Sequence, residues 1–346
     1  MKPEPSSSEL SLSTVPWRPR IGLTFGDPAG IGPEVVRAAL ADTELAERVR
    51  FVAIGPAREW PAGARSWDPR DPRDRAALAG ETALFLDSGG PHEHTLGAPQ
   101  AACGRAALDA LRAGHELAVA GDVDALVTAP VSKEALALAG EPVEGQTQLL
   151  ARWSNAPRTQ MMAIAGNLRV LLLTRHIPLA QAIKAITTQA VVEHLEMLNA
   201  ALLDFGFAAP RLALAGLNPH AGEAGLLGRE EIEILAPAVL TARARGIDVS
   251  GPLSPDTVFQ SASRGRFDAV LALYHDQAFI PVKLLDPDGG LTVLLGLPYL
   301  RVSPAHGTAF DIAGRGIASA ASLIGAVRQA AAWASARHAA QKGSSA

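Results

Sequence analysis

Short apolar runs alternate along this chain with longer stretches in which apolar positions recur every three or four residues. The apolar runs lie at 21–25, 51–55, 124–130, 170–174, 211–217 and 268–274. The helical patterns cover 33–41, 106–120, 179–186, 191–205, 230–246 and 318–336. This alternation predicts βαβ units around a largely parallel sheet, and therefore an α/β fold.

Three of the apolar runs are followed by a histidine. His176 closes RVLLLTRH, His220 closes RLALAGLNPH, and His275 follows DAVLALY. Because parallel strands end along one edge of a sheet, the three imidazoles are placed to converge on one divalent cation. A single histidine at a strand end is more often a packing or hydrogen-bonding residue. The polar neighbours in 218–223 and 274–277 favour a site instead, since buried polar clusters are costly.

Composition restricts the class of protein and its compartment. The chain has 346 residues, 48% of them hydrophobic and 19% charged, which suits two packed domains and excludes a disordered protein. Its net charge of −4 offers no basic surface for nucleic acid or an anionic membrane, and no run of about 18 apolar residues predicts a transmembrane helix. Residues 1–20 lack the apolar core of a signal peptide, and we expect a flexible arm there. Cys103, the only cysteine, excludes an internal disulfide, fits a reducing cytoplasm and is expected to pack in the core.

Two glycine-rich segments are candidates for contacting a ligand. Residues 26–34 read GDPAGIGPE, a spacing that matches neither the Rossmann fingerprint nor the P-loop, and such a turn alone is more often structural. Residues 306–316 read HGTAFDIAGRG and offer backbone donors, the His306 imidazole and the Asp311 carboxylate. This second set suits the adenine and ribose of a dinucleotide.

Three cationic residues stand near predicted strand ends. Lys133 ends the segment TAPVSK, where a lysine alone is more often a structural surface residue. Lys283 and Arg301 lie just beyond predicted strands, in YHDQAFIPVK and GLPYLR, close to the expected metal edge. We therefore regard these two as the stronger candidates for binding an anion.

Taken in order, these motifs resemble those of the 4-hydroxythreonine-4-phosphate dehydrogenases of pyridoxine phosphate biosynthesis. The matching segments are GDPAGIGPE, TAPVSK, NPHAGE with GLLGREE, GPLSPDT, YHDQ, LGLPYLR and HGTAFDIAGRG, between about Ile21 and Ser322. The resemblance implies an isocitrate/isopropylmalate dehydrogenase-like fold, with two α/β/α domains and a cleft between them. We expect residues 21–137 with 300–340 to form a discontinuous first domain, and residues 138–299 to form the second, which carries the metal and substrate residues.

The resemblance also implies roles for individual residues. It assigns a divalent metal to His176, His220 and His275, in a site shared across a homodimer; zinc suits these ligands best, and magnesium or cobalt are alternatives. It assigns substrate contacts to Gln146, Thr147, Lys283, Thr292 and Arg301, and NAD or NADP to His306, Gly307, Thr308 and Asp311. Asp256 is expected to assist the metal, and Lys133 is a candidate general base.

The activity implied is oxidation of a small phosphorylated hydroxy acid. For 4-hydroxythreonine 4-phosphate, hydride transfer to NAD(P)+ followed by loss of CO2 gives 3-amino-2-oxopropyl phosphate, a precursor of pyridoxal phosphate. Three positions depart from the family pattern: Gln146 replaces a histidine, Thr292 an asparagine and Ala305 an aspartate. These changes leave open a phosphorylated threonate or erythronate, or a cis-dihydrodiol dicarboxylate, as substrate. A non-catalytic metal- or nucleotide-binding homologue is a further alternative, which the three histidines disfavour.

Overall fold

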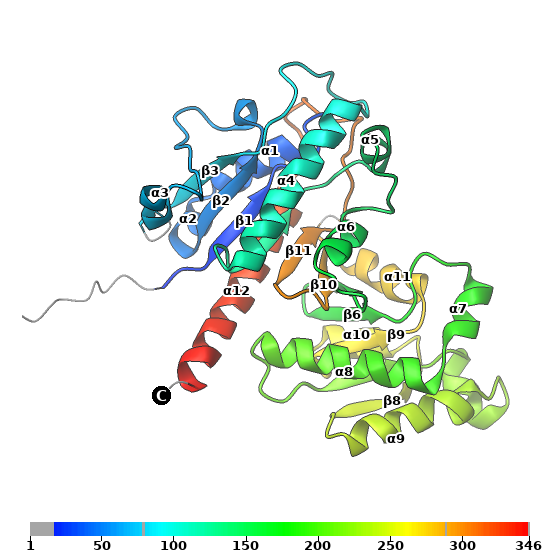
Figure 1. Ribbon diagram of the computed structural model, residues 1–346. Helices are drawn as coiled ribbons and strands as arrows, with labels where there is room; N and C mark the ends of the chain where they lie inside the picture. Colours follow the sequence, from blue (N-terminus) through cyan, green and yellow to red (C-terminus); the bar gives the residue numbers. More distant parts are fainter. Residues whose placement is uncertain (1–16, 78–79, 288, 345–346) are drawn as a thin grey trace, which may run out of the picture.

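The computed structural model describes residues 17–77, 80–287 and 289–344, and a single mixed sheet runs through them (Figure 1). The strand order is β3-β2-β1-β4-β11-β10-β5-β6-β9-β7-β8. The strands are β1 Arg20–Thr24, β2 Arg50–Gly55, β3 Ala83–Asp87, β4 Ala125–Thr128, β5 Gln160–Ala165, β6 Leu168–Leu172, β7 Leu212–Ala215, β8 Val249–Leu253, β9 Ala269–Ala272, β10 Leu291–Leu295 and β11 Arg301–Pro304.

The sheet is largely parallel, which confirms the fold class predicted from the alternating pattern. The antiparallel pairings, β11 with β10, β10 with β5, and β5 with β6, lie in the middle of the sheet. They join a parallel half that contains β3, β2, β1, β4 and β11 to a parallel half that contains β6, β9, β7 and β8. The chain leaves the first half after β4 and returns to it between β10 and β11. The division into two domains at residues 137 and 300 stays a prediction.

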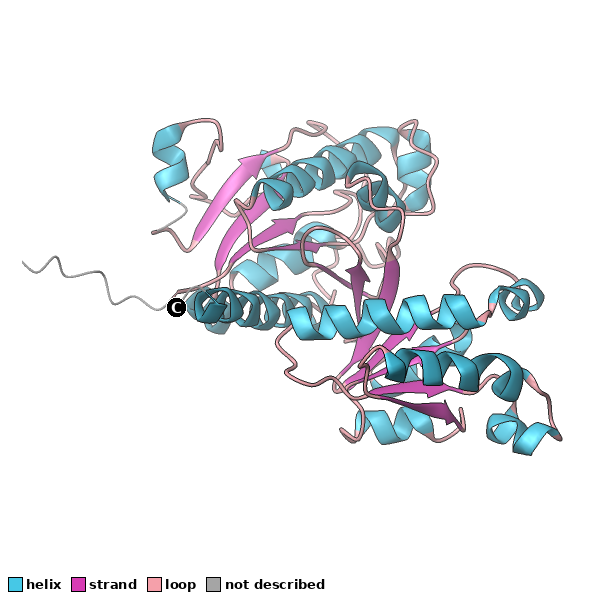
Figure 2. Ribbon diagram, turned by 60° about the horizontal axis from the view of Figure 1, so that its bottom comes forward, coloured by secondary structure: helices cyan, strands magenta, loops and turns pink. Residues whose placement is uncertain are grey.

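Helices cover both faces of the sheet (Figure 2). They are α1 Gly32–Leu40, α2 Thr43–Arg48, α3 Pro72–Ala77, α4 Ala101–Ala120, α5 Lys133–Leu138, α6 Gln146–Trp153, α7 Leu179–Ala185, α8 Thr188–Asp204, α9 Ala236–Ala244, α10 Val258–Ser263, α11 His275–Leu285 and α12 Ala321–Ser344, with short turns η1 Ala57–Glu59, η2 Pro219–Gly225 and η3 Glu231–Leu235. None of the helices in the described ranges is long and apolar enough to cross a membrane.

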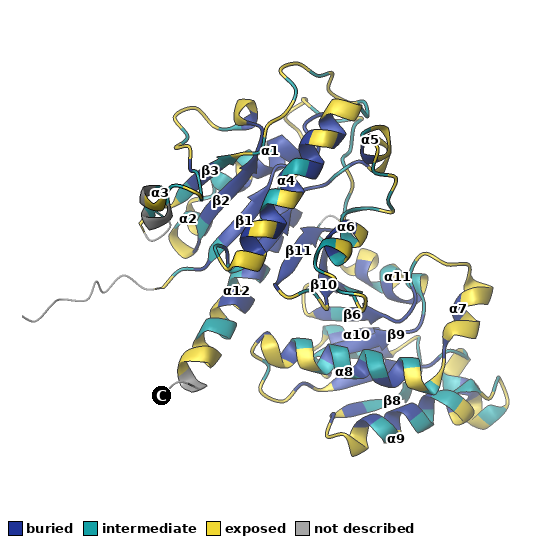
Figure 3. Ribbon diagram, in the orientation of Figure 1, coloured by how far each residue is buried: buried dark blue, intermediate teal, exposed yellow. Residues whose placement is uncertain are grey.

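Alternation of side chains along the strands explains the three layers. In β2, Phe51 and Ala53 join the core cluster that includes α1 and α12, whereas Val52 and Ile54 join the cluster under α4. The central strands are accordingly buried on both faces and dark blue in Figure 3, whereas the edge strands β3 and β8 are only partly buried. Cys103 of α4 lies in this core, where burial raises the pKa of its thiol to about 11.

The last residues of the predicted N-terminal arm are part of the folded chain. Residues 1–16 of the predicted arm lie outside the described residues. Trp17 stacks on His338 with 3.9 Å between ring centroids, and Arg20 already belongs to β1. The last helix continues to Ser344.

Strands β6, β9 and β7 are parallel neighbours, so the segments that follow them meet at one edge of the sheet. The buried Gln277 ties two of these segments together. Its Oε1 accepts from Leu273 N at 2.7 Å, and its Nε2 donates to Gly216 O at 2.7 Å. The ends of β9 and β7 are thus held in register by one side chain.

Hydrogen bonds to a buried carboxylate fix the segment that carries His220. Residues 220–224 all have positive φ, between 46° and 82°, and only one of the five is glycine, so this turn is strained. Glu231, 3% exposed, accepts hydrogen bonds from Leu217 N at 2.8 Å and from Asn218 N at 2.7 Å. Its other oxygen accepts from Asn218 Nδ2 at 2.8 Å. The carboxylate therefore fixes the start of the strained turn.

We expect Glu231→Gln to destabilise the protein because the new amide places a donor opposite backbone N–H groups. The free energy of unfolding should fall by about 1–3 kcal/mol, measured by urea denaturation. Glu233→Gln is the matched control, since Glu233 is 58% exposed and pairs only with Arg229 on the surface. Equal stability of the two variants would contradict the bracing role.

Candidate active site

A pocket of about 660 Å³ opens beside the antiparallel strands in the middle of the sheet. Its walls come from segments far apart in the sequence: 128–133, 144–148, 159–161, 175–177, 275–283 and 301–307. Of the residues that the sequence assigned to substrate, Gln146, Thr147, Lys283, Thr292 and Arg301 all line it. His176 and His275 line it as well, so most of the predicted site is brought together in one cavity.

His176 and His275 face each other at the end of this pocket. Their ring centroids are 5.5 Å apart, and they follow the neighbouring strands β6 and β9. His275 Nδ1 lies 2.7 Å from Asp276 Oδ1, a hydrogen bond that leaves Nε2 of this ring available as a ligand. Burial, followed by the charges of Lys133 and His275, lowers the pKa of His176. This shift favours the neutral imidazole, the form that binds metals.

His220 lies apart from this pair. It does not line the pocket, and among the described residues no group of three His, Cys, Asp or Glu side chains is placed to hold a metal ion. Its charge acts instead on Asp256, whose pKa is lowered first by the hydrogen bond from Ser254 Oγ at 2.6 Å and to a smaller extent by His220. Asp256 lines a separate groove between α10 and α11. One chain thus assembles two of the three predicted metal ligands.

Arg301, the first residue of β11, is a buried cation. It is 4% exposed and donates to Thr128 Oγ1 at 2.7 Å and, weakly, to Gln146 Oε1 at 3.4 Å. Its Nε is buried without a partner. Burial lowers its pKa to about 10, only Tyr299 opposes this shift, and no carboxylate of the described residues contributes. A guanidinium in this situation is a ready binding site for an anion.

The other predicted substrate residues surround Arg301 in different ways. Gln146 Nε2 donates to Ala129 O at 2.9 Å, which fixes the amide with its oxygen toward the guanidinium. Thr292 is buried, with its hydroxyl 2.8 Å from Ser303 Oγ. The placement of Lys283 beyond a strand was wrong, because AFIPVK forms part of α11. Lys283 shares one helix face with His275, two turns earlier, and so still reaches the pocket.

Lys133 lies at the rim of the pocket as the first residue of α5. Its side chain is exposed. A lysine is adapted to act as a general base when its side chain is removed from water. A single chain leaves Lys133 in contact with water.

The two glycine-rich segments lie against each other. Ile31 N donates to Thr308 O at 3.0 Å, and a Cβ on Gly30 would lie 2.8 Å from the same oxygen. His306 and Gly307 line the pocket, and Nε2 of His306 is buried without a partner. Asp311 is exposed. Glycine at position 30 is thus required by the close packing of the two loops.

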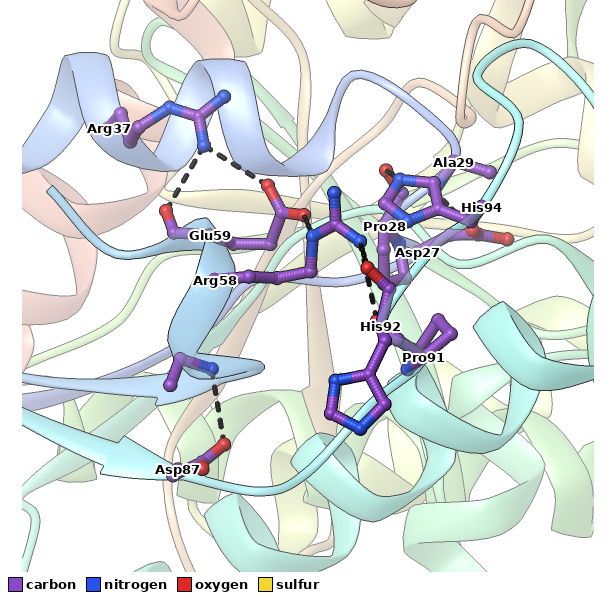
Figure 4. A network of polar contacts seen from close by, with 11 residues as sticks. Asp27, Pro28, Ala29, Arg37, Arg58, Glu59, Asp87, Pro91, His92 and His94 are labelled. Atoms are coloured by element: carbon purple, nitrogen blue, oxygen red, sulfur yellow. Dashed lines mark hydrogen bonds and ion pairs between the residues drawn. The ribbon is translucent and has the colours of Figure 1, made fainter.

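A polar network that was not predicted from the sequence lies behind the first of these loops (Figure 4). His94 Nε2 lies 3.0 Å from Pro28 O, Arg58 donates to His92 O, and Arg37 bonds the Glu59 carboxylate at 3.2 Å. The network attaches the segment around His94 to the turn after β1. The two histidines of PHEH were the only local signal, and they do not reveal which backbone they contact.

Comparison with known proteins gives a consistent assignment. The family model described as pyridoxal phosphate biosynthetic protein PdxA matches residues 40–330. A 4-hydroxythreonine-4-phosphate dehydrogenase of Geobacter metallireducens is 42% identical over 328 residues, covering 91% of this chain and 95% of the relative. A D-threonate 4-phosphate dehydrogenase of Cupriavidus necator is 43% identical over 325 residues, covering 91% and 97%.

A solved structure agrees in fold with these sequence relatives. The crystal structure of 4-hydroxythreonine-4-phosphate dehydrogenase from Klebsiella pneumoniae matches with a TM-score of 0.80 and 37% identity, covering 91% of this chain and 99% of that one. The resemblance stated from the motifs is confirmed: the chain belongs to the PdxA family of pyridoxal phosphate biosynthetic proteins.

Proposed function

We propose that the protein oxidises the secondary alcohol of a phosphorylated four-carbon hydroxy acid, with hydride passing to NAD(P)+ and CO2 leaving the resulting β-keto acid. The buried Arg301 guanidinium, which opens onto a pocket with two facing histidines, carries this proposal. One candidate substrate is 4-hydroxythreonine 4-phosphate, giving 3-amino-2-oxopropyl phosphate. D-threonate 4-phosphate is the other, because a relative of similar identity is named for it.

The phosphate is the group that suits Arg301. Charge-assisted hydrogen bonds in a desolvated site are stronger than those at a surface, and Arg301 has donor capacity that the protein does not use. Lys283 and Thr147 line the same pocket and add a charge and a hydroxyl. Gln146 contributes an amide where the family has a histidine, and it orients Arg301 through its oxygen.

His176 and His275 fit a divalent metal, because both are imidazoles at one pocket end and Asp276 orients the second. Zinc is the first candidate, and magnesium or cobalt are alternatives. When bound, the cation supplies positive charge that acidifies the alcohol and offsets the charge developed on decarboxylation. We assign His220 as the third ligand, with Asp256 beside it, and Lys133 as a candidate proton acceptor at the rim.

A nicotinamide cofactor follows from the dehydrogenase names of the relatives. The residues we assign to it are His306, Gly307, Thr308 and Asp311. The unpartnered Nε2 of His306 and the open space around Gly307 support this placement. The segment packs on the turn after β1, which fixes its position beside the pocket.

A homodimer with a shared site is supported by the surface of α11. His275, Phe279 and Lys283 face the pocket, whereas Ile280 and Leu284 face the opposite groove of about 500 Å³ and are 59% and 79% exposed. Contiguous exposed apolar side chains mark interaction surfaces. A second copy docked on this groove would lie beside Asp256 and within reach of the metal end.

A non-catalytic homologue is the alternative from another class. The buried Arg301 speaks against it, because a buried cation without a carboxylate partner is costly unless a ligand neutralises it. We place the enzyme in the cytoplasm, since its single cysteine is a buried thiol. Reduction of NAD(P)+ by the purified, metal-loaded protein with either phosphorylated acid tests the proposal, and no turnover with both would refute it.

Replacing His176, His220 or His275 by alanine should each remove the bound metal and the activity while leaving the fold intact. Elemental analysis of the purified variants measures occupancy. His92→Ala, at an exposed loop position, is the control and should keep its metal. Full occupancy in the His220→Ala protein would exclude His220 as a ligand.

Arg301→Ala should lower kcat/KM by roughly two orders of magnitude, because losing a desolvated charge-assisted bond costs about 2–4 kcal/mol. Arg301→Lys keeps the charge and should retain part of the activity. Arg70→Ala, whose side chain is 88% exposed, should change kcat/KM little. Unaltered kinetics of a folded Arg301→Ala enzyme would remove the phosphate role.

Leu284→Asp should convert a dimer into a monomer and abolish activity, measured by sedimentation velocity and initial rates. Val119→Asp, on a 57% exposed position of α4, is the control. Mixing inactive His220→Ala and His275→Ala proteins tests sharing directly. Subunit exchange should restore activity if the two ligands of a site come from different chains, and its absence would place the site within one chain.

A further inference from the structure

The pocket holds an excess of positive charge. Its lining includes four cationic side chains, Lys133, Arg175, Lys283 and Arg301, and among the described residues a single carboxylate, that of Glu144. A divalent metal at the histidines would add to this excess. The field of such a pocket favours a ligand with several negative charges and disfavours one that carries an ammonium group.

Arg175 is the cation for which neither the motifs nor the comparisons supply a role. It follows β6 and immediately precedes His176. The side chain is partly buried, and the hydrogen bond that it forms among the described residues is a long one, from Nη2 to Thr159 O at 3.5 Å. Glu144 acts on its charge but forms no ion pair with it among the described residues. Its guanidinium thus retains most of its capacity for a ligand.

Other arginines of this chain show what a structural role looks like here. Arg20 is held by Asp124 at 3.0 Å, and Arg211 by Asp268 at 3.0 Å, each at the start of a strand. In both cases a carboxylate neutralises the guanidinium. Arg175 has no such carboxylate and points into a cavity instead.

The sheet sets the distance between the two pocket arginines. Arg301 belongs to β11 and Arg175 follows β6, with β10 and β5 between them. Three inter-strand steps span about 14 Å, and each arginine side chain extends several ångströms from its strand. Both guanidinium groups line the same pocket, which can therefore take a four-carbon chain with an anionic group directed toward each of them, and His176 follows Arg175 directly in the sequence.

We propose that Arg175 is a specificity-determining residue that binds the carboxylate end of the substrate and makes the site prefer a hydroxyl over an ammonium group on the adjacent carbon. This rests on the proposed function. In a phosphorylated four-carbon acid, the carbon in question lies between the carboxylate and the alcohol that is oxidised. That alcohol must lie at His176 and His275, so the neighbouring substituent is within the field of Arg175.

The substrate class that follows is a phosphorylated 2,3-dihydroxy acid, in preference to its 2-amino counterpart. The dihydroxy acid phosphate carries three negative charges when fully ionised, whereas the amino acid offsets one of them. A cation that forms no ion pair within the described residues interacts favourably with the former and repels the ammonium group of the latter. The preference therefore does not require any direct contact to the hydroxyl.

The test compares kcat/KM for D-threonate 4-phosphate and 4-hydroxythreonine 4-phosphate with the metal-loaded enzyme. The wild type should prefer the threonate by roughly tenfold or more. Arg175→Gln should reduce kcat/KM for the threonate by at least about tenfold, mainly through KM, and bring the ratio close to one. Arg175→Lys, which keeps the charge, should retain the preference, and Arg70→Gln is the surface control.

Inhibition by inorganic phosphate separates the two arginines. Arg175→Gln should leave the inhibition constant unchanged, because phosphate is assigned to Arg301. A ratio of kcat/KM values that is unchanged in Arg175→Gln would overturn the proposal. A selective rise in KM for the dinucleotide, with the ratio unchanged, would assign Arg175 to the cofactor and equally overturn it.

If the wild type oxidises neither compound, the proposed function fails, and the role of Arg175 is decided by binding alone. Calorimetry would then compare D-threonate 4-phosphate binding to wild type and to Arg175→Gln. Binding at least tenfold weaker in the variant supports an anion site at Arg175. Equal affinity overturns it.

Discussion

Burying a guanidinium without a carboxylate beside it is the constraint around which the pocket is organised. Thr128 and Gln146 satisfy only part of the donor capacity of Arg301, and burial lowers its pKa to about 10. Pairing it with an internal acid would lower that cost, as it does for Arg20. Among the described residues no carboxylate pairs with this charge, which borders the cavity, so an anionic ligand would complete its environment.

The histidines follow the ends of neighbouring parallel strands, and hydrogen bonds from buried polar side chains fix the positions of these segments. Gln277 links the ends of β9 and β7, and Glu231 fixes the turn in which His220 adopts a left-handed conformation. Strain of this kind persists only where surrounding bonds determine the backbone. The histidines therefore stand on segments whose positions are set by the sheet and by two side chains that touch no substrate.

How much the sequence predicts depends on the range of the interactions involved. Alternating periodicity predicts the layers, and strand ends predict the edge where His176 and His275 meet, because both are local properties of the chain. The helical position of Lys283 was missed, since Pro281 and its apolar neighbours resemble a strand end. Glu231 was missed because nothing local distinguishes it from Glu230 and Glu233 as the acid that is buried.

The charged side chains that line the pocket are carried by several strands along one edge of the sheet. Arg301, to which we assign the phosphate, lies on β11, and the facing histidines proposed to hold a metal lie three strands away, beside Arg175. In the proposed complex the reacting carbon would be held between two fixed charges, which would limit its motion more than either contact alone. Asp256 lines the separate groove in which Ile280 and Leu284 are exposed, and His220 acts on its charge. In the proposed homodimer, the interface on this groove would bury Ile280 and Leu284 and would also complete the metal site. Association and catalysis would then depend on a single interface.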